Sequence, residues 1–358
     1  MNKKVLIAMS GGVDSSVAAY LMKQRGFDCI GVTMKLFANE DIGISREHSC
    51  CSLDDVEDAR SVAYSLDMPY YVFNFSDRFE TDVIDRFVHA YENGITPNPC
   101  IDCNRYLKFD KLYMRAKELD RDYVVTGHYA RVEKDENGRF LLKKALDDTK
   151  DQSYVLYCLT QEQLSHTIFP LGEMRKSQAR EIAESQGFIN SRKADSQDIC
   201  FVQNGSYADF IEQYTGKNYP DGDFLDTNGN VIGRHKGVIR YTVGQRKGLG
   251  ISAPEPLYVK AVNPVSNTVT LSYNDGLYSS IVKAGDINLI SVPEIKGEMR
   301  VKAKVRYRHT EQWATVTQNS DTITAVFDEP QRAVTCGQAL VLYDGDTVVG
   351  GGTIIEVE

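Results

Sequence analysis

Long hydrophobic runs are missing from this 358-residue sequence, and so are several motifs of common enzyme classes. No apolar stretch approaches the ~20 residues of a membrane helix, and the N-terminal apolar run is too short for a signal peptide. No Gly-Lys-Ser/Thr triplet occurs, which excludes the usual P-loop of NTPases. Cys100 and Cys103 form a CxxC pair, but no second pair or paired histidines complete a zinc site. We therefore expect a cytoplasmic protein without a membrane partner, a zinc site or a conventional P-loop.

The first chemical signal is SGGVDSS, residues 10–16, which follows an apolar run at 5–9 and precedes residues with helical spacing. Adjacent glycines let the backbone approach a ligand, and a helix N-terminus attracts anions. The stretch therefore predicts a phosphate or pyrophosphate site, with an ordinary capped turn as the alternative.

The first 200 residues alternate short apolar strands with helical stretches. The expected strands are at 5–9, 29–34, 70–75 and 123–128, and the expected helices include 54–66 and 79–91. This alternation predicts a doubly wound, mostly parallel sheet with ligands beyond the carboxyl ends of its strands. Residues 10–16, Met34 and Gly127–His128 all lie at such ends and could line one pocket. Asn137–Gly138 predicts a hairpin turn inserted in this half.

Beyond about residue 201 the sequence is typical of β structure, with turn pairs such as Asn228–Gly229, Asp275–Gly276 and Asp344–Gly345. The fold class is therefore α/β followed by β. We expect a nucleotide-binding domain over 1–200, a small central β-rich domain over 201–278, and a C-terminal β-barrel over 279–358.

Charge is unevenly distributed. The net charge of −9 argues weakly against a nucleic-acid partner, but residues 227–254 contain five cations and no carboxylate. Residues 299–310 alternate apolar and basic positions, which predicts a strand with Lys302, Lys304, Arg306 and Arg308 on its outer face. The two segments favour a groove for a polyanion, and a solvated face is the alternative.

Three cysteines have positions that suggest chemistry. Cys100 and Cys103 stand where an extended Pro-containing loop enters a helix, a position that favours a reactive or ligating thiolate, and Cys200 ends the α/β half. The expected small core residues are Cys29, Cys158 and Cys336. For Cys50 and Cys51 we prefer a structural role.

An ordered set of motifs resembles the bacterial tRNA-specific 2-thiouridylases: SGGVDSS, TPNPCIDCN, GHYAR, KDQSYVLY, DSQDICF, GQRKGLGI and RYR. This resemblance implies an ATP enzyme with a pyrophosphatase loop and with Mg²⁺, which adenylates the 2-carbonyl of the wobble uridine and then transfers sulfur from a cysteine persulfide. The products would be 2-thiouridine, AMP and pyrophosphate. The implied partners are tRNAs for Lys, Glu and Gln, and a cysteine desulfurase or sulfur-relay protein.

The resemblance also implies residue roles. Cys103 matches the nucleophile and Cys200 the persulfide carrier, with a transient Cys103–Cys200 disulfide, and Asp14 would lie near Mg²⁺. The positions matching ATP contacts are Ala8, Met9, Ser10, Gly11, Gly12, Val13, Asp14, Ser15, Met34 and Gly127. The positions matching tRNA contacts are Thr96, Pro97, Asn98, Pro99, His128, Lys150, Asp151, Gln152, Arg306, Tyr307 and Gln338.

Cys100 departs from the family pattern, because many relatives carry Asp at this position. Cys100, Cys103 and Cys200 together resemble the ligands of RNA thiolases that hold a [4Fe–4S] cluster. Thiolation through such a cluster is one alternative. A small-molecule ATP ligase with the same loop and a non-catalytic RNA-binding protein are the others.

Overall fold

The computed structural model describes residues 3–37, 53–195, 199–202 and 206–358, so Cys50 and Cys51 lie outside the described residues. The chain divides into two compact units. The first contains residues 1–84, 99–204 and 345–349, and the second contains 85–98, 205–344 and 350–358. Within the described residues, no helix has the length and apolar character needed to cross a membrane.

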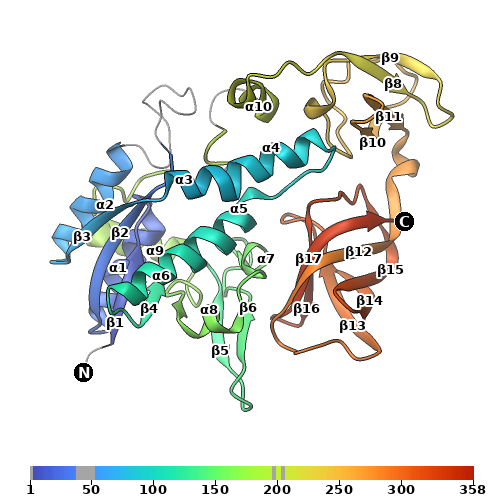
Figure 1. Cartoon of the computed structure of the whole chain (residues 1–358). Coiled ribbons are helices and arrows are strands. Elements are labelled where there is room, and N and C mark those ends of the chain that lie inside the picture. Colours follow the sequence, from blue (N-terminus) through green and yellow to red (C-terminus); the bar gives the residue numbers. More distant parts are fainter. Residues whose placement is uncertain (1–2, 38–52, 196–198, 203–205) are drawn as a thin grey trace. The chain divides into compact units, whose positions relative to one another are not determined.

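The first unit is built on a five-stranded parallel sheet (Figure 1). Its strands, in spatial order, are β3 (Tyr70–Asn74), β2 (Asp28–Lys35), β1 (Lys4–Ala8), β4 (Tyr123–Val125) and β7 (Thr167–Ile168). All pairs are parallel, so the strands end at one edge of the sheet. The expected parallel sheet is confirmed, although the strand expected at 123–128 ends at Val125.

Helices α1 (Val13–Gln24), α2 (Leu53–Ser65) and α9 (Lys176–Ser185) share one apolar core with β1 and β2. Val5 and Ile7 face this core and are fully buried. Leu6 points to the opposite face by strand alternation and is also fully buried, so both faces of the sheet are covered. Helix α1 is followed by Gly26 in the left-handed conformation, as expected for a helix C-terminus.

A helical stretch begins at α3 (Ser76–Phe79), continues through the π-helical η1 (Glu80–Ile84) and ends with α4 (Asp85–Glu92), which agrees with the helix expected at 79–91. A second stretch contains α5 (Pro99–Asp102), the π-helical η2 (Cys103–Lys111) and α6 (Leu112–Glu118), and α6 packs against β4. Two short helices follow, α7 (Ser153–Leu156) and α8 (Gln161–Ser165).

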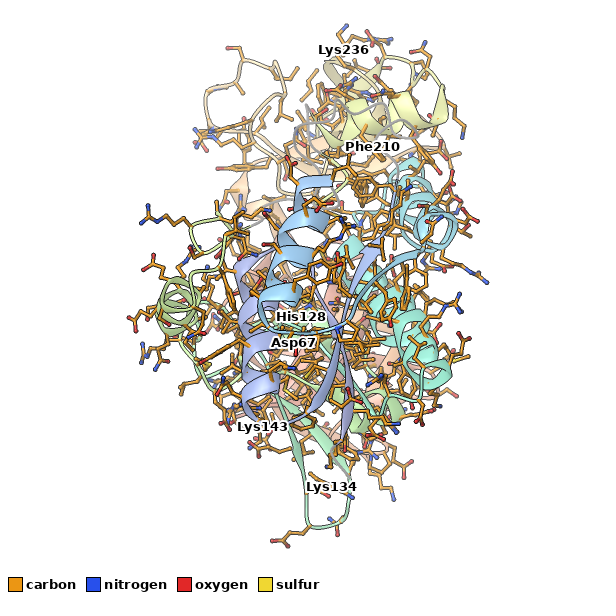
Figure 2. The ribbon with its side chains drawn as sticks, turned by 90° about the vertical axis from the view of Figure 1, so that its left-hand side faces the viewer. Asp67, His128, Lys134, Lys143, Phe210 and Lys236 are labelled. Atoms are coloured by element: carbon orange, nitrogen blue, oxygen red, sulfur yellow. The ribbon has the colours of Figure 1, made fainter. Side chains whose placement is uncertain are left out.

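The hairpin expected around Asn137–Gly138 is present. It consists of β5 (Arg131–Lys134) and β6 (Phe140–Lys143), which carry Lys134 and Lys143 (Figure 2). Gly138 has φ +87°, a conformation that glycine adopts without steric cost. Lys143 also pairs with Thr347, which belongs to the same unit.

The second unit contains α4 and, after Asn204, continues with α10 (Tyr207–Thr215) and a four-stranded sheet. The sheet order is β10 (Tyr258–Asn263), β11 (Thr268–Ser272), β8 (Gly222–Leu225) and β9 (Val231–His235), with the short 3₁₀ helix η3 (Val238–Arg240) after β9. Its core includes Phe224, Val259 and Leu271.

A closed antiparallel barrel follows a second 3₁₀ helix, η4 (Asn274–Leu277). Its strands are β12 (Tyr278–Leu289), β13 (Glu298–Lys304), β14 (Gln312–Asn319), β15 (Thr322–Arg332), β16 (Ala339–Asp344) and β17 (Thr347–Val357). Pairing of β12 with both β15 and β17 closes the ring. The expected fold class, an α/β domain followed by β-rich structure and a C-terminal barrel, is confirmed.

Candidate active site

The loop from β1 to α1 ends in a helix N-terminus without a side-chain cap. Gly12 is the N-cap of α1 and no side chain accepts from its first N–H groups, an arrangement suited to an anion. Ser15 Oγ donates to the Gly12 carbonyl oxygen at 3.0 Å and accepts from the Ser10 N–H at 3.2 Å. The serines therefore hold the loop conformation from within.

Two glycines allow the close packing around this loop. Gly11 has φ +75°, and a Cβ there would overlap the carbonyl oxygen of Asp55 in α2. A Cβ on Gly127, which follows β4, would lie 2.8 Å from the Asp14 carbonyl carbon and from the Ser15 nitrogen. The end of β4 thus rests directly on the first turn of α1, which places Gly127 beside the loop as the sequence suggested.

Asp14, in the first turn of α1, has two polar partners. Both carboxylate oxygens accept from Lys176 Nζ at 2.7 Å, and Oδ1 also accepts from the Tyr129 hydroxyl at 2.8 Å. Burial and the Asp14 charge together raise the pKa of Tyr129, so this hydroxyl stays protonated and remains a donor.

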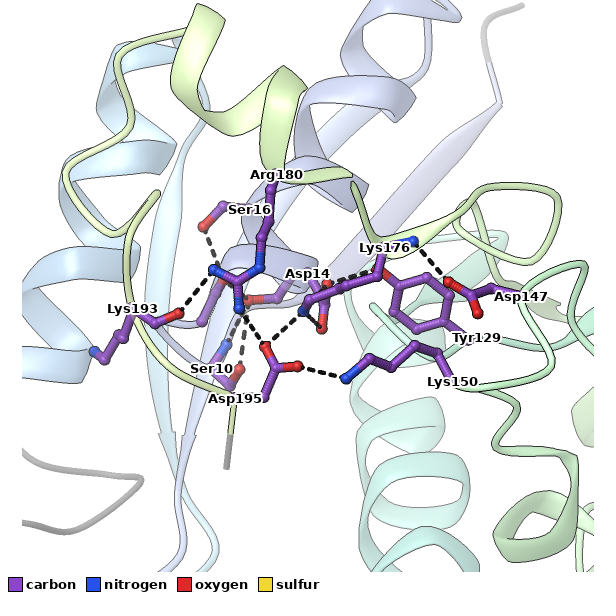
Figure 3. A network of polar contacts seen from close by, with 12 residues as sticks. Ser10, Asp14, Ser16, Tyr129, Asp147, Lys150, Lys176, Arg180, Lys193 and Asp195 are labelled. Carbon is purple, nitrogen blue, oxygen red and sulfur yellow. Dashed lines mark hydrogen bonds and ion pairs between the residues drawn. The ribbon is translucent and has the colours of Figure 1, made fainter. Parts of the chain in front are cut away.

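Asp195 lies at the centre of a cluster of cations (Figure 3). Its Oδ1 contacts Lys176 Nζ at 2.8 Å and an Arg180 nitrogen at 2.9 Å, and its Oδ2 accepts from Lys150 Nζ at 2.9 Å. Burial alone would raise the pKa of Asp195, but the hydrogen bonds from Lys176 and Lys150 outweigh it and lower the pKa to about 2. Asp195 is therefore ionised at neutral pH.

Two further side chains hold the loop from the other side. Asn190 Nδ2 donates to the Gly11 carbonyl oxygen and to Ser16 Oγ, both at 2.9 Å. Lys193 Nζ pairs with Asp58 at 2.7 Å and with Asp55. The segment 190–195 is thereby attached to both α1 and α2.

His128 is buried between the rings of Phe109 and Phe169, with centroid distances of 5.8 and 5.9 Å. Its Nδ1 is 2.7 Å from Thr126 Oγ1. Burial, with a smaller contribution from Lys108, lowers the pKa of His128 well below the usual range, so the imidazole is neutral.

The expected contact segment Lys150–Gln152 lies next to the residues that follow β4. Gln152 Oε1 accepts from the Tyr129 N–H at 3.0 Å, and the Gln152 N–H donates to the Tyr129 carbonyl at 2.9 Å. Asp151 accepts from the Ala145 N–H at 3.0 Å and from the Ser153 hydroxyl at 2.7 Å. The structure therefore brings this segment and His128 to the same side of the first unit.

The cysteines of interest are thiols in the structure. Cys100 is exposed in the first turn of α5, Cys103 is buried as the first residue of η2, and Cys200 is half-buried. Phe201, directly after Cys200, is buried against Phe79 at 5.7 Å. Across the described ranges, no three His, Cys, Asp or Glu side chains are grouped as a metal site. Cys29 and Cys158 are buried as expected, and Cys336 is only half-buried.

In the second unit, Gln338 holds Thr96 and Pro97, two of the positions expected to contact tRNA. Its Nε2 donates to the carbonyl oxygens of Thr96 at 2.9 Å and Pro97 at 3.2 Å, and the Thr96 N–H donates to the Cys336 carbonyl oxygen at 3.0 Å. Residues 96 and 97 are thereby attached to the chain around Gln338.

The expectation of a continuous basic strand over 299–310 is wrong, because β13 ends at Lys304. Arg306 is half-buried and donates to the Ala333 carbonyl oxygen and to Thr335 Oγ1, so it does not lie on an outer strand face. Tyr307, expected to point inward, is 39% exposed. The turn after β13 interrupts the alternation.

Residues 227–254 contain no carboxylate, but carboxylates from other parts of the chain lie beside them in the structure. Carboxylates from neighbouring elements pair with three cations of this segment: Arg234 with Asp223, Lys236 with Asp221, and Arg240 with Asp209 and Glu212. Arg246 and Lys247 form no ion pair within the residues that the structure describes. These two side chains are the part of the segment that remains suited to phosphate contacts.

Sequence reasoning missed Tyr129, Lys176, Arg180, Asn190 and Asp195 as parts of the loop environment. Asp195 starts the DSQDICF motif, so a partial signal existed for it. Lys176 is the first residue of α9, and its local sequence shows only a helix start.

Comparison with known families matches nearly the whole chain. The model described as tRNA methyl transferase HUP domain matches residues 3–204, the tRNA methyl transferase PRC-barrel domain matches 208–273, and the aminomethyltransferase beta-barrel domain matches 279–354.

Curated relatives are similar over the full length. The chain is 52% identical over 356 residues to the tRNA-specific 2-thiouridylase MnmA of Clostridioides difficile strain 630, covering 99% of this chain and 98% of that protein. It is 52% identical to the protein of the same name from Lachnoclostridium phytofermentans, covering 99% of this chain and 100% of that protein.

Solved structures resemble part of the chain. A 4-thiouridine synthetase–RNA complex with bound ATP covers 60% of this chain and 50% of its own, with 18% identity and a TM-score of 0.36. The NMN synthetase from Francisella tularensis covers 60% and 78%, with 17% identity and a TM-score of 0.34.

Proposed function

The chain belongs to the family of the tRNA-specific 2-thiouridylases, and we propose that it uses ATP to convert a tRNA uridine to 2-thiouridine. The observation that carries this proposal is the full-length similarity at 52% identity, together with the anion-binding loop and the cysteines at 103 and 200. We further propose the wobble uridine of tRNAs for Lys, Glu and Gln as the substrate, and domain boundaries at residues 200 and 278.

Adenylation uses the loop of the first unit. The uracil 2-carbonyl oxygen attacks the α-phosphate of ATP, forming a carbon–oxygen–AMP ester and releasing pyrophosphate. The N-terminal N–H groups of α1 offset the developing charge on the phosphates. Because Gly127 has no side chain, the chain after β4 can lie directly against the first turn of α1. We also propose that Met34 contacts the adenosine of ATP.

Mg²⁺ bound with ATP would offset the charge of the phosphates. Asp14 is suited to hold the ion, because its carboxylate lies in the first turn of α1 and its side chain is 31% exposed.

Sulfur transfer uses two thiols of the chain. The thiolate of Cys103 attacks the inner sulfur of a persulfide on Cys200, which forms the Cys103–Cys200 disulfide and releases hydrosulfide. Hydrosulfide attacks C2 of the adenylated uracil and displaces AMP, leaving the 2-thiocarbonyl. A thiol reductant then restores both cysteines, and a cysteine desulfurase or a sulfur-relay protein loads the next persulfide.

The tRNA contacts are proposed at Thr96–Pro99, His128, Lys150–Gln152, Arg306–Tyr307 and Gln338. Several of these side chains already bond within the protein: Gln338 holds Thr96 and Pro97, and Gln152 holds Tyr129. We therefore propose that these two glutamines act mainly by presenting the contact segments.

Pyrophosphate release and nucleoside mass spectrometry test the function. Wild-type protein should release pyrophosphate from ATP only with tRNA, and should form 2-thiouridine when a persulfide donor is added. Cys200→Ala should keep tRNA-dependent pyrophosphate release and lose 2-thiouridine, while Cys336→Ala serves as the matched control and keeps both.

Three outcomes contradict the proposal. Pyrophosphate release without tRNA favours a small-molecule ligase, and tRNA binding without release favours a non-catalytic protein. Full thiolation by Cys200→Ala rejects the persulfide role. Iron analysis of anaerobically purified protein addresses the cluster alternative, since about four irons per chain that disappear in Cys200→Ala would favour it.

A further inference from the structure

The cations around Asp195 are unusually numerous for one carboxylate. Lys150, which precedes α7, and Lys176 and Arg180, both on α9, all contact it within 2.9 Å. Asp14 accepts from the same Lys176 side chain, and Asp147 accepts from the Lys176 backbone N–H at 2.9 Å. Lys176 is also nearly buried, with 10% of its side chain exposed. The side chains of Lys150 and Arg180 are 36% and 35% exposed, so a ligand can reach them from solvent.

The cluster lies at the N-terminal end of α1. Lys176 bridges it to Asp14, which is in the first turn of that helix and 2.7 Å from the ammonium (Figure 3). The uncapped N–H groups of α1 and the three cations therefore point to the same region. Both features favour an anion of more than one charge.

We infer that Lys150, Lys176 and Arg180 form a second half of the pyrophosphate site, and that Asp195 occupies part of this site until the phosphates of ATP displace it. The inference deepens the proposed function, because it names ligands for the same reaction. A phosphate is a better partner than Asp195, since it has three acceptor oxygens and a larger charge.

Two substitutions test the inference, one that removes a positive charge and one that removes a negative charge. The probe is inorganic pyrophosphate, titrated calorimetrically into the full chain without tRNA or a sulfur donor. Lys176→Met should weaken pyrophosphate binding by about tenfold or more, because it removes a charge-assisted hydrogen bond. Asp195→Asn should tighten pyrophosphate binding by about threefold or more, because it removes the competing carboxylate and keeps its shape.

The matched control is Lys117→Met, which removes a lysine from a surface pair with Glu162 on the same unit. This change should leave pyrophosphate affinity unchanged. If Lys176→Met fails to fold, Asp195→Asn alone decides, because a merely structural Asp195 predicts weaker binding and a competing Asp195 predicts tighter binding.

A backbone phosphate of tRNA is the other ligand that these cations would bind. The affinity for tRNA is therefore measured by filter binding without ATP. If Lys176→Met weakens tRNA binding and leaves pyrophosphate binding unchanged, the inference is overturned. Unchanged or weaker pyrophosphate binding by Asp195→Asn also overturns it. These measurements need no turnover, so failure of the 2-thiouridine assay leaves them interpretable.

Discussion

Gly127→Ala is expected to disturb the contact between β4 and α1. The added Cβ would lie 2.8 Å from the Asp14 carbonyl carbon and the Ser15 nitrogen, and 3.1 Å from Asp14 Cβ. Two of these three atoms are backbone, so no side-chain rotation relieves the contact. The strand end or the first turn of α1 must move to restore van der Waals separation.

Overpacking of this kind costs about 1–3 kcal/mol. The same movement displaces the N–H groups of the loop, so pyrophosphate affinity should fall with stability. Because the chain has two units, a single unfolding free energy is a poor measure. Local opening of α1 is measured better by amide hydrogen exchange with mass spectrometry, in which 1–3 kcal/mol corresponds to roughly 5- to 150-fold faster exchange.

Gly285→Ala is the matched control. A Cβ at Gly285 in β12 would meet Ile355 at 3.5 Å, an ordinary contact distance. Its exchange and pyrophosphate binding should therefore remain close to wild type. If Gly127→Ala also shows wild-type exchange in α1 and wild-type pyrophosphate affinity, the close approach of β4 to the loop is refuted.

Two further predictions concern the second unit. Gln338→Met loses both hydrogen bonds to the Thr96 and Pro97 carbonyls, so thiolation kcat/KM should fall by about tenfold. Pyrophosphate affinity should not change. Equal losses in both assays would reject a role of Gln338 in presenting this segment. Burial lowers the pKa of His235, whose Nδ1 accepts from the Gly237 N–H. Since the unfolded chain then binds the proton more readily, the central sheet should lose stability as pH falls below about 6.5. Hydrogen exchange in β8 and β9 at pH 7.5 and 5.5, corrected for intrinsic rates, measures this loss; His235→Gln should flatten it, and an equal pH response in that variant would assign the effect to other groups.

The parallel sheet and the loop from β1 into α1 could be predicted from the sequence because both depend on local patterns. Apolar runs separated by helical spacing identify a buried parallel sheet, and SGGVDSS at a strand-to-helix junction has few structural uses other than binding an anion. The motif set identified the family for the same reason, since its order along the chain is itself sequence information.

Charge partners could not be predicted in this way, because ion pairs join residues that are distant in sequence. Residues 227–254 contain no carboxylate, yet the fold supplies Asp221 to Lys236 and Asp209 to Arg240. The alternation after Lys304 likewise indicated a strand, but a turn redirects Arg306 toward backbone carbonyls.

The cation cluster is the strongest case. Asp14 and Lys176 are 162 residues apart in sequence and meet only because α9 packs against α1. Local sequence therefore determined the glycine-containing loop and the helix N-terminus that begin at residue 10. Tertiary packing alone decided which cations complete their surroundings, because electrostatic interactions depend on distance in space and not on distance along the chain.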